Sequence, residues 1–216
     1  MENHQSLIQL NAAEQRVIGA LIEKSRTTPD YYPMTISALT NACNQKTSRN
    51  PVVNYDEETV TLTLNALKIK GLISTATGGS SRVIKYKHNL AIIYPLVPSE
   101  LAVLCLLLLR GPLTPGEINT NSARLFEFET IEEIQDILQK LSGEEPPYVL
   151  QMEKKPGQKE ARYKHLFGTG PAEPEFQVTA TEATQPAEPS ALELRVAKLE
   201  QEMEELKEMI NILLNQ

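Results

Sequence analysis

The sequence is poor in the residue types that build metal sites and disulfide frameworks. Its 216 residues include two cysteines, three histidines and no tryptophan. Cys43 and Cys105 lie about 60 residues apart in apolar stretches, and no CxxC pair is present. We therefore expect two buried free thiols rather than a disulfide, and we predict no metal ligands and no cofactor.

Long apolar runs are also missing. The longest uninterrupted run, residues 101–109, is far shorter than the roughly 18 residues needed to cross a bilayer. Residues 1–9 show no basic stretch followed by an apolar core, which is the pattern of a secretory signal. We expect a cytoplasmic protein that has no membrane partner.

The motifs of the common enzyme classes do not occur in this chain. There is no GxGxxG, GxxxxGK[ST], HExxH or GxSxG pattern. Glu57 and Glu58 are adjacent, so on a helix they point in different directions and make a poor acid/base pair. We predict a protein without catalytic residues, not an enzyme.

What the sequence does contain is an internal repeat. Lys85-Tyr86-Lys87-His88 returns as Arg162-Tyr163-Lys164-His165, and each copy closes an apolar strand pattern that follows helical patterns. Helices are predicted over residues 12–24, 35–44 and 56–70 before the first copy, and over 99–109, 115–125 and 130–141 before the second. The hairpin turns are predicted at Gly78-Gly79 and Pro156-Gly157. Tyr86 and Tyr163 are expected to pack each hairpin onto its domain.

Three short helices followed by a two-stranded wing are typical of the winged helix, a helix-turn-helix variant. The predicted fold class is therefore α+β and mainly helical, with two tandem winged-helix domains and a C-terminal coiled-coil helix. The predicted boundaries are 1–95 and 96–168 for the two domains, 169–190 for a flexible linker and 191–216 for the coiled coil.

Charge is distributed unevenly along the chain. The net charge is +3 over residues 1–97, -3 over residues 98–168 and -7 over residues 169–216, which sum to the total of -7. Because nucleic-acid affinity depends on neutralising phosphates, the first domain is the better candidate for binding DNA.

The connection between the second and third predicted helices, residues 44–55, is much longer than a minimal helix-turn-helix turn. It is either a nucleic-acid contact or a polar loop that orders the entry to the third helix. The third helix is expected to face the core with Val60, Leu64, Leu67, Ile69 and Leu72, and its acidic first turn would repel phosphates. Contact with DNA is therefore expected through side chains of the loop, the third helix and the wing that can reach phosphates and base edges. These residues are Gln45, Lys46, Arg49, Asn50, Lys68, Arg82, Lys85 and Lys87.

The third helix of the second domain is acidic around its start. Such a surface suits protein contacts as readily as DNA contacts. The acidic residues are Glu127, Glu129, Glu132, Glu133 and Asp136.

The C-terminal segment carries a heptad pattern. Residues 168–189 are rich in Pro, Glu, Thr and Ala, a composition that cannot fold alone. Beyond them, apolar residues recur at alternating spacings of four and three, which favours a parallel homodimeric coiled coil over a helix docked on its own domain. The predicted dimerisation residues are Leu192, Val196, Leu199, Met203, Leu206, Ile210 and Leu213.

Three segments of the first domain resemble the YceH-like family of uncharacterised bacterial proteins. They are residues 10–24, the Tyr32-Pro33-Met34-Thr35 entry to the second helix, and the loop from Asn44 to Val52. The resemblance covers residues 7–168 and continues into the coiled coil. It implies two winged-helix domains in a bacterial cytoplasm, and it implies no established biochemical activity.

Two functional hypotheses follow. The first is a dimeric regulator that binds double-stranded DNA through phosphate contacts of the first winged helix. The second is an architectural adaptor whose winged helices bind protein, resembling the acidic tandem winged-helix subunits of chromosome-segregation ATPases.

Overall fold

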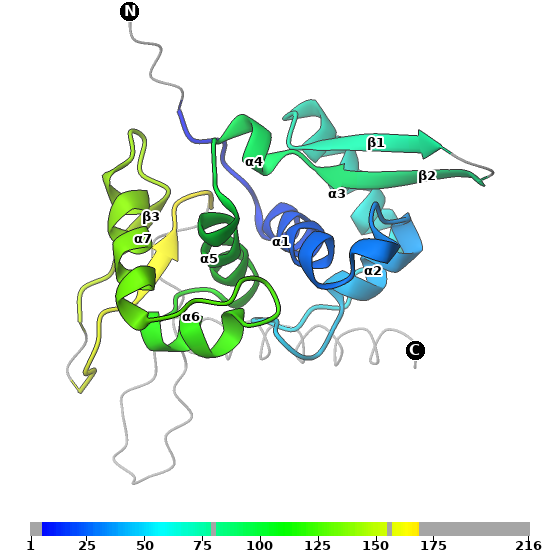
Figure 1. The fold of residues 1–216 in the computed structure, drawn as a ribbon. Coiled ribbons are helices and arrows are strands. Elements are labelled where there is room, and N and C mark those ends of the chain that lie inside the picture. Colours follow the sequence, from blue (N-terminus) through cyan, green and yellow to red (C-terminus); the bar gives the residue numbers. More distant parts are fainter. Residues whose placement is uncertain (1–5, 79–80, 155–156, 169–216) are drawn as a thin grey trace, which may run out of the picture. The chain divides into compact units, whose positions relative to one another are not determined.

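Two successive groups of three helices, each followed by an antiparallel hairpin, form the described part of the chain (Figure 1). The computed structural model describes residues 6–78, 81–154 and 157–168. The first group comprises α1 (Ala12–Thr27), α2 (Ile36–Cys43), α3 (Glu57–Ile69), β1 (Ile73–Gly78) and β2 (Ser81–His88). The second comprises α5 (Pro98–Arg110), α6 (Pro115–Ser122), α7 (Ile131–Gly143), β3 (Val149–Gln151) and β4 (Tyr163–His165). The predicted helices and the α+β class are confirmed.

Two short elements were not predicted from the sequence. A single 3-10 turn, η1 (Pro29–Tyr31), precedes the loop into α2, and the one-turn helix α4 (Leu90–Ile93) connects the two groups. Neither is long enough to produce a helical periodicity in the sequence.

Helix starts are encoded locally. A side-chain oxygen of the residue before the helix accepts a hydrogen bond from a backbone N–H of the first turn, which satisfies a donor that the helix itself leaves unpaired. Asn11 and Thr114 do so within reciprocal capping boxes with Glu14 and Glu117. The other caps of this kind are Thr35, Asp56 and Thr130.

The repeated tyrosines anchor each hairpin in the same way. Tyr86 and Met34 exchange two backbone hydrogen bonds of 2.7 and 3.0 Å, and Tyr163 and Leu113 exchange two of 2.8 and 3.1 Å. Met34 and Leu113 each lie directly before the N-cap residue of the second helix of their group. Both tyrosine side chains pack against the hydrophobic core, as predicted. The repeated sequence therefore corresponds to the same attachment of each hairpin to its helices.

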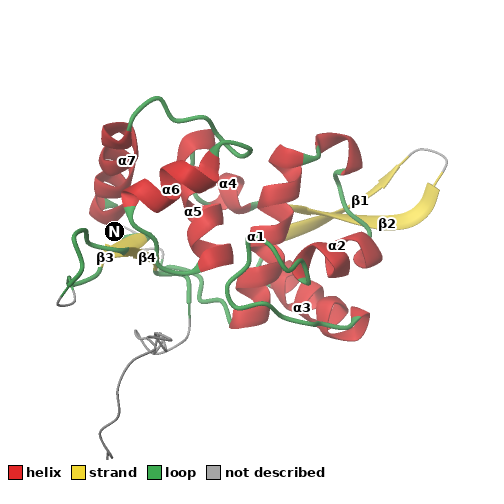
Figure 2. Cartoon of the chain, turned by 90° about the horizontal axis from the view of Figure 1, so that it is seen from below, coloured by secondary structure: helices red, strands yellow, loops and turns green. Residues whose placement is uncertain are grey.

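The first helices of the two groups, α1 and α5, lie next to each other in both views (Figures 1 and 2). Gly19 permits this approach, because a Cβ atom there would lie 2.7 Å from Cδ2 of Leu109. The Sγ atom of Cys105 also contacts the Gly19 carbonyl oxygen at 3.4 Å. The apolar run 101–109 is buried between α1 and the other elements of the second group, so the two groups share one core. The predicted domain boundary at residue 95 stays a prediction.

The core face of α3 differs from the prediction at one position. Val60, Leu64 and Leu67 are buried, and so is Leu72 after the helix, but Ile69 is 88 % exposed. Residues two positions apart on a helix point about 200° away from each other, so Ile69 faces away from the side on which Leu67 is buried. The prediction that Ile69 faces the core was wrong.

Cys43 and Cys105 are buried free thiols, as predicted. Burial raises the pKa of Cys43 to about 12 and that of Cys105 still further above its ordinary value. No helix within the described ranges is both long and apolar enough to span a membrane. The predicted linker and coiled coil, residues 169–190 and 191–216, lie outside the described residues.

Candidate functional site

Arg49, predicted to contact nucleic acid, lies in the interior. Its guanidinium donates to both carboxylate oxygens of Glu23, at 2.6 and 3.0 Å, and to the Ala42 carbonyl oxygen. Burial raises the pKa of Glu23, but the hydrogen bonds and charge of Arg49 outweigh it, so this pKa is below its ordinary value. Arg49 thus holds the connection after α2 against α1, and in this arrangement its side chain cannot reach a phosphate.

The connection over residues 44–55 also forms hydrogen bonds with the C-terminal end of α5. The backbone N–H of Asn50 donates to the Leu109 carbonyl oxygen at 2.9 Å, and the Asn50 amide donates to the Arg110 carbonyl oxygen at 3.3 Å. The last carbonyl groups of a helix have no partner within the helix. The unusual length of this connection therefore has a structural reason, because it reaches from α2 to the C-terminal end of α5.

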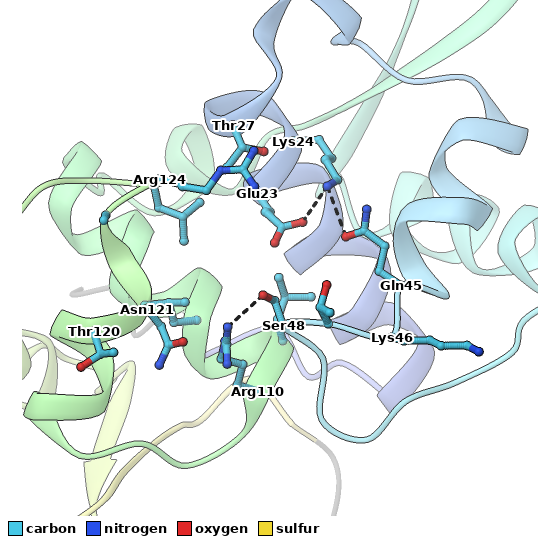
Figure 3. A pocket seen from close by; sticks show the side chains of 15 residues that line it. Glu23, Lys24, Thr27, Gln45, Lys46, Ser48, Arg110, Thr120, Asn121 and Arg124 are labelled. Atoms are coloured by element: carbon cyan, nitrogen blue, oxygen red, sulfur yellow. Dashed lines mark hydrogen bonds and ion pairs between the residues drawn. The ribbon is translucent and has the colours of Figure 1, made fainter.

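The remaining predicted loop residues have different surroundings. The Gln45 amide oxygen accepts hydrogen bonds from Lys24 and Arg49 at 3.3 and 3.2 Å. Lys46 is exposed, and Figure 3 shows its side chain extending away from the neighbouring cavity. Of the predicted loop residues, Lys46 is thus the one whose charge is on the surface.

The first hairpin brings two predicted residues to one face. Side chains alternate along a strand, so Lys85 and Lys87 of β2 lie on the face opposite to Tyr86 and His88. Tyr86 packs on the core, and Lys87 is exposed while Lys85 is partly exposed. Lys68 is exposed on α3, a separate element, and the Arg82 side chain lies outside the described residues.

The two histidines of the repeat occupy equivalent, half-buried positions. His88 pairs with Ile73 across the first hairpin, and His165 pairs with Val149 across the second. Burial lowers the pKa of each imidazole to about 4. Both are neutral near pH 7, which suits a packing role. In the described part of the chain, no group of three or more His, Cys, Asp or Glu residues could hold a metal ion.

A cavity of about 430 Å³ lies beside the connection after α2, and sequence reasoning missed it. Its walls come from the C-terminal ends of α1 and α5, from residues 45–48 and from the end of α6 with the residues that follow it (Figure 3). Lys24, Arg110 and Arg124 line it, although the chain separates them widely. The available signal was Arg110, a cation that ends an otherwise apolar helical run.

Comparison with known proteins places the chain in a family. The family model described as "Protein of unknown function, DUF480" matches residues 10–158. A UPF0502 protein of Shewanella pealeana is 47 % identical, over 96 % of this chain and 100 % of its own. UPF0502 proteins of Aliivibrio fischeri and Pelobacter propionicus are 45 % and 43 % identical, each over 94 % of this chain and over 96 % and 93 % of their own lengths. As the resemblance to YceH-like proteins indicated, the chain belongs to the DUF480/UPF0502 family of uncharacterised bacterial proteins.

Proposed function

We propose that this chain is a dimeric tandem winged-helix protein that binds duplex DNA through the hairpin of its first group, in the cytoplasm and without catalysis. The order of three helices and a hairpin, present twice, supports the winged-helix assignment. The shared anchoring of both hairpins by Tyr86 and Tyr163 supports it further.

The observation that carries the proposal is the outward face of β2. Lys85 and Lys87 stand two residues apart on one side of a strand whose other side is fixed to the body of the protein. A hairpin held by paired backbone bonds presents these ammonium groups in a defined direction. Ammonium groups so placed can contact successive phosphates of a DNA backbone.

The α3 helix sets the expected mode of binding. Its first turn exposes Glu57 and Glu58, and these carboxylates would be repelled by phosphates in a DNA groove. Binding through the hairpin, with support from Lys46 and Lys68, needs no insertion of this turn. We therefore expect contacts to the backbone, with weak preference for sequence and a dissociation constant of roughly 1–100 µM at physiological salt.

A matched pair of double variants tests the proposal. Lys85→Ala/Lys87→Ala should weaken binding of a short mixed-sequence duplex by about tenfold or more in fluorescence anisotropy. Lys154→Ala/Lys159→Ala removes the same charge from exposed positions near the second hairpin and should bind like wild type. Equal affinity of the two variants, or no binding by wild type at low salt, would rule out this function.

A specific observation favours a second candidate, the protein-binding adaptor. Leu62 and Ile69 of α3 are 63 % and 88 % exposed, on the helix that would otherwise approach DNA. Exposed apolar side chains on a helix suit a protein partner better than phosphates. Under this alternative, wild type retains a stoichiometric partner after nuclease treatment of a lysate, Leu62→Ser/Ile69→Ser loses it, and Lys85→Ala/Lys87→Ala keeps it.

A further inference from the structure

The cavity between the two groups has the size and the lining of a site for a small ligand. Its volume of about 430 Å³ lies within the roughly 300–1,000 Å³ typical of such sites. Thr27, Thr47, Ser48, Thr120 and Asn121 contribute hydroxyl and amide groups to its walls. Leucine side chains of α5 and of the segment after α6 supply an apolar part. The lining therefore offers a polar region for a charged group and an apolar region for an organic moiety.

Positive charge dominates the cavity. The lining includes the four cations Lys24, Lys46, Arg110 and Arg124 and one carboxylate, that of Glu23. Both oxygens of Glu23 already accept hydrogen bonds from the buried Arg49. Lys46 extends away, and Lys24 already pairs with Glu23 at 3.2 Å and donates to the Gln45 amide oxygen at 3.3 Å (Figure 3). Arg110 and Arg124 are therefore the cavity cations that no carboxylate of the lining neutralises. An anion entering here would meet an excess of positive charge in partly buried surroundings.

Two buried donors at the cavity wall lack a partner. Within the described ranges, neither the Nε–H of Arg110 nor the hydroxyl of Thr27 makes a hydrogen bond, although both atoms are buried. Another part of the same guanidinium donates to the Ser48 hydroxyl at 2.9 Å, which fixes the direction of Arg110. Buried polar groups are nearly always hydrogen-bonded, so unpaired donors at a cavity wall are placed to bind an acceptor that enters the cavity. Burial, assisted by the charge of Arg49, also lowers the pKa of Arg110, an effect that an anion would oppose.

We propose that this cavity binds the phosphate group of a small molecule through Arg110 and Arg124, with Lys24 and Thr27 as further donors. A phosphate has several acceptor oxygens and up to two negative charges, and the planar fork of a guanidinium matches its geometry. The walls come from both groups of helices, so the ligand would connect the first group to the second. This site is separate from the hairpin lysines and does not depend on DNA binding.

Calorimetric titration of the full chain with pyrophosphate at constant ionic strength tests the proposal. Wild type should show saturable binding with one site per chain. Arg124→Ala, which changes an exposed side chain, should weaken binding by about tenfold, because a charge-assisted contact is lost. Arg26→Ala is the matched control: it removes an exposed arginine of α1 that does not line the cavity, and it should bind as wild type does.

Arg110→Gln is the second variant and should weaken binding at least as much. Circular dichroism would confirm that it folds, and Arg124→Ala keeps the test decisive if it does not. Absence of saturation in wild type, or equal weakening by Arg26→Ala and Arg124→Ala, would overturn the proposal. A titration with a short DNA duplex distinguishes the source of the phosphate. If the duplex displaces pyrophosphate and its own binding requires Arg110, the site serves the DNA backbone and the small-molecule proposal fails.

Discussion

Arg49 is a side chain of the type that binds phosphates, but here it stabilises the protein interior. Its guanidinium neutralises Glu23 and satisfies the Ala42 carbonyl group, so removing it leaves a largely buried carboxylate without its main partner. We predict that Arg49→Ala lowers the free energy of unfolding by about 3–5 kcal/mol in urea denaturation. Lys46→Ala, in the same loop but exposed, should change it by less than about 0.5 kcal/mol. Similar values for the two variants would show that Arg49 is not structural.

His88 and His165 make stability depend on pH. Their pKa is about 4 in the folded chain, below the ordinary 6.5, chiefly because of burial. Below pH 6.5 the unfolded chain binds protons that the folded chain does not, so the free energy of unfolding falls as the pH drops from 6.5 toward 4. We predict a loss of about 2 kcal/mol per histidine by pH 5.

The comparison uses urea denaturation at neutral pH and at pH about 5. His88→Gln/His165→Gln cannot take up these protons, so its free energy of unfolding should fall less with acidity than that of wild type. An equally large fall in the variant would place the pH dependence on other groups.

At the level of elements, local sequence predicts the helices but does not predict the sites that form between them. Apolar periodicity predicted α3 and α6, and in the structure Asp56 and Thr114 cap their first turns. The cavity depends on α1, α5 and α6 meeting at residues such as Arg110 and Arg124. Local periodicity carries no information on which helices meet. For the same reason, the sequence identified the 44–55 connection as unusual but not its contact with α5.

The contact of α1 with α5 predicts the effect of a substitution at Gly19. A larger side chain would overlap Leu109, whose Cγ and Cδ2 lie 2.8 and 2.7 Å from the position of a Cβ atom. We predict that Gly19→Val lowers the free energy of unfolding by about 1–3 kcal/mol through overpacking. Gly143→Val, at the end of α7 with no atom within 4 Å of its Cβ position, is the control and should be nearly neutral. Thermal denaturation of both variants separates the outcomes, and a neutral Gly19→Val would mean that the helices can move apart freely.

At the scale of the whole molecule, dimerisation is predicted by heptads that lie outside the described residues. Val196 and Met203 are core positions one heptad apart in the predicted coiled coil, so acidic side chains there should prevent pairing. We predict that light scattering gives twice the chain mass of 24.1 kDa for wild type and 24.1 kDa for Val196→Asp/Met203→Asp. An unchanged mass in the variant would move the dimer contact elsewhere.

The proposed binding of DNA is electrostatic. The salt dependence of duplex binding therefore tests the proposal most directly. Each phosphate contact contributes about 0.9 to the slope of log K against log salt concentration. Removing two contacts by Lys85→Ala/Lys87→Ala should therefore reduce that slope by about 2 relative to wild type, when duplex binding is measured across a salt series. An identical slope for the variant and wild type would contradict DNA binding through the first hairpin.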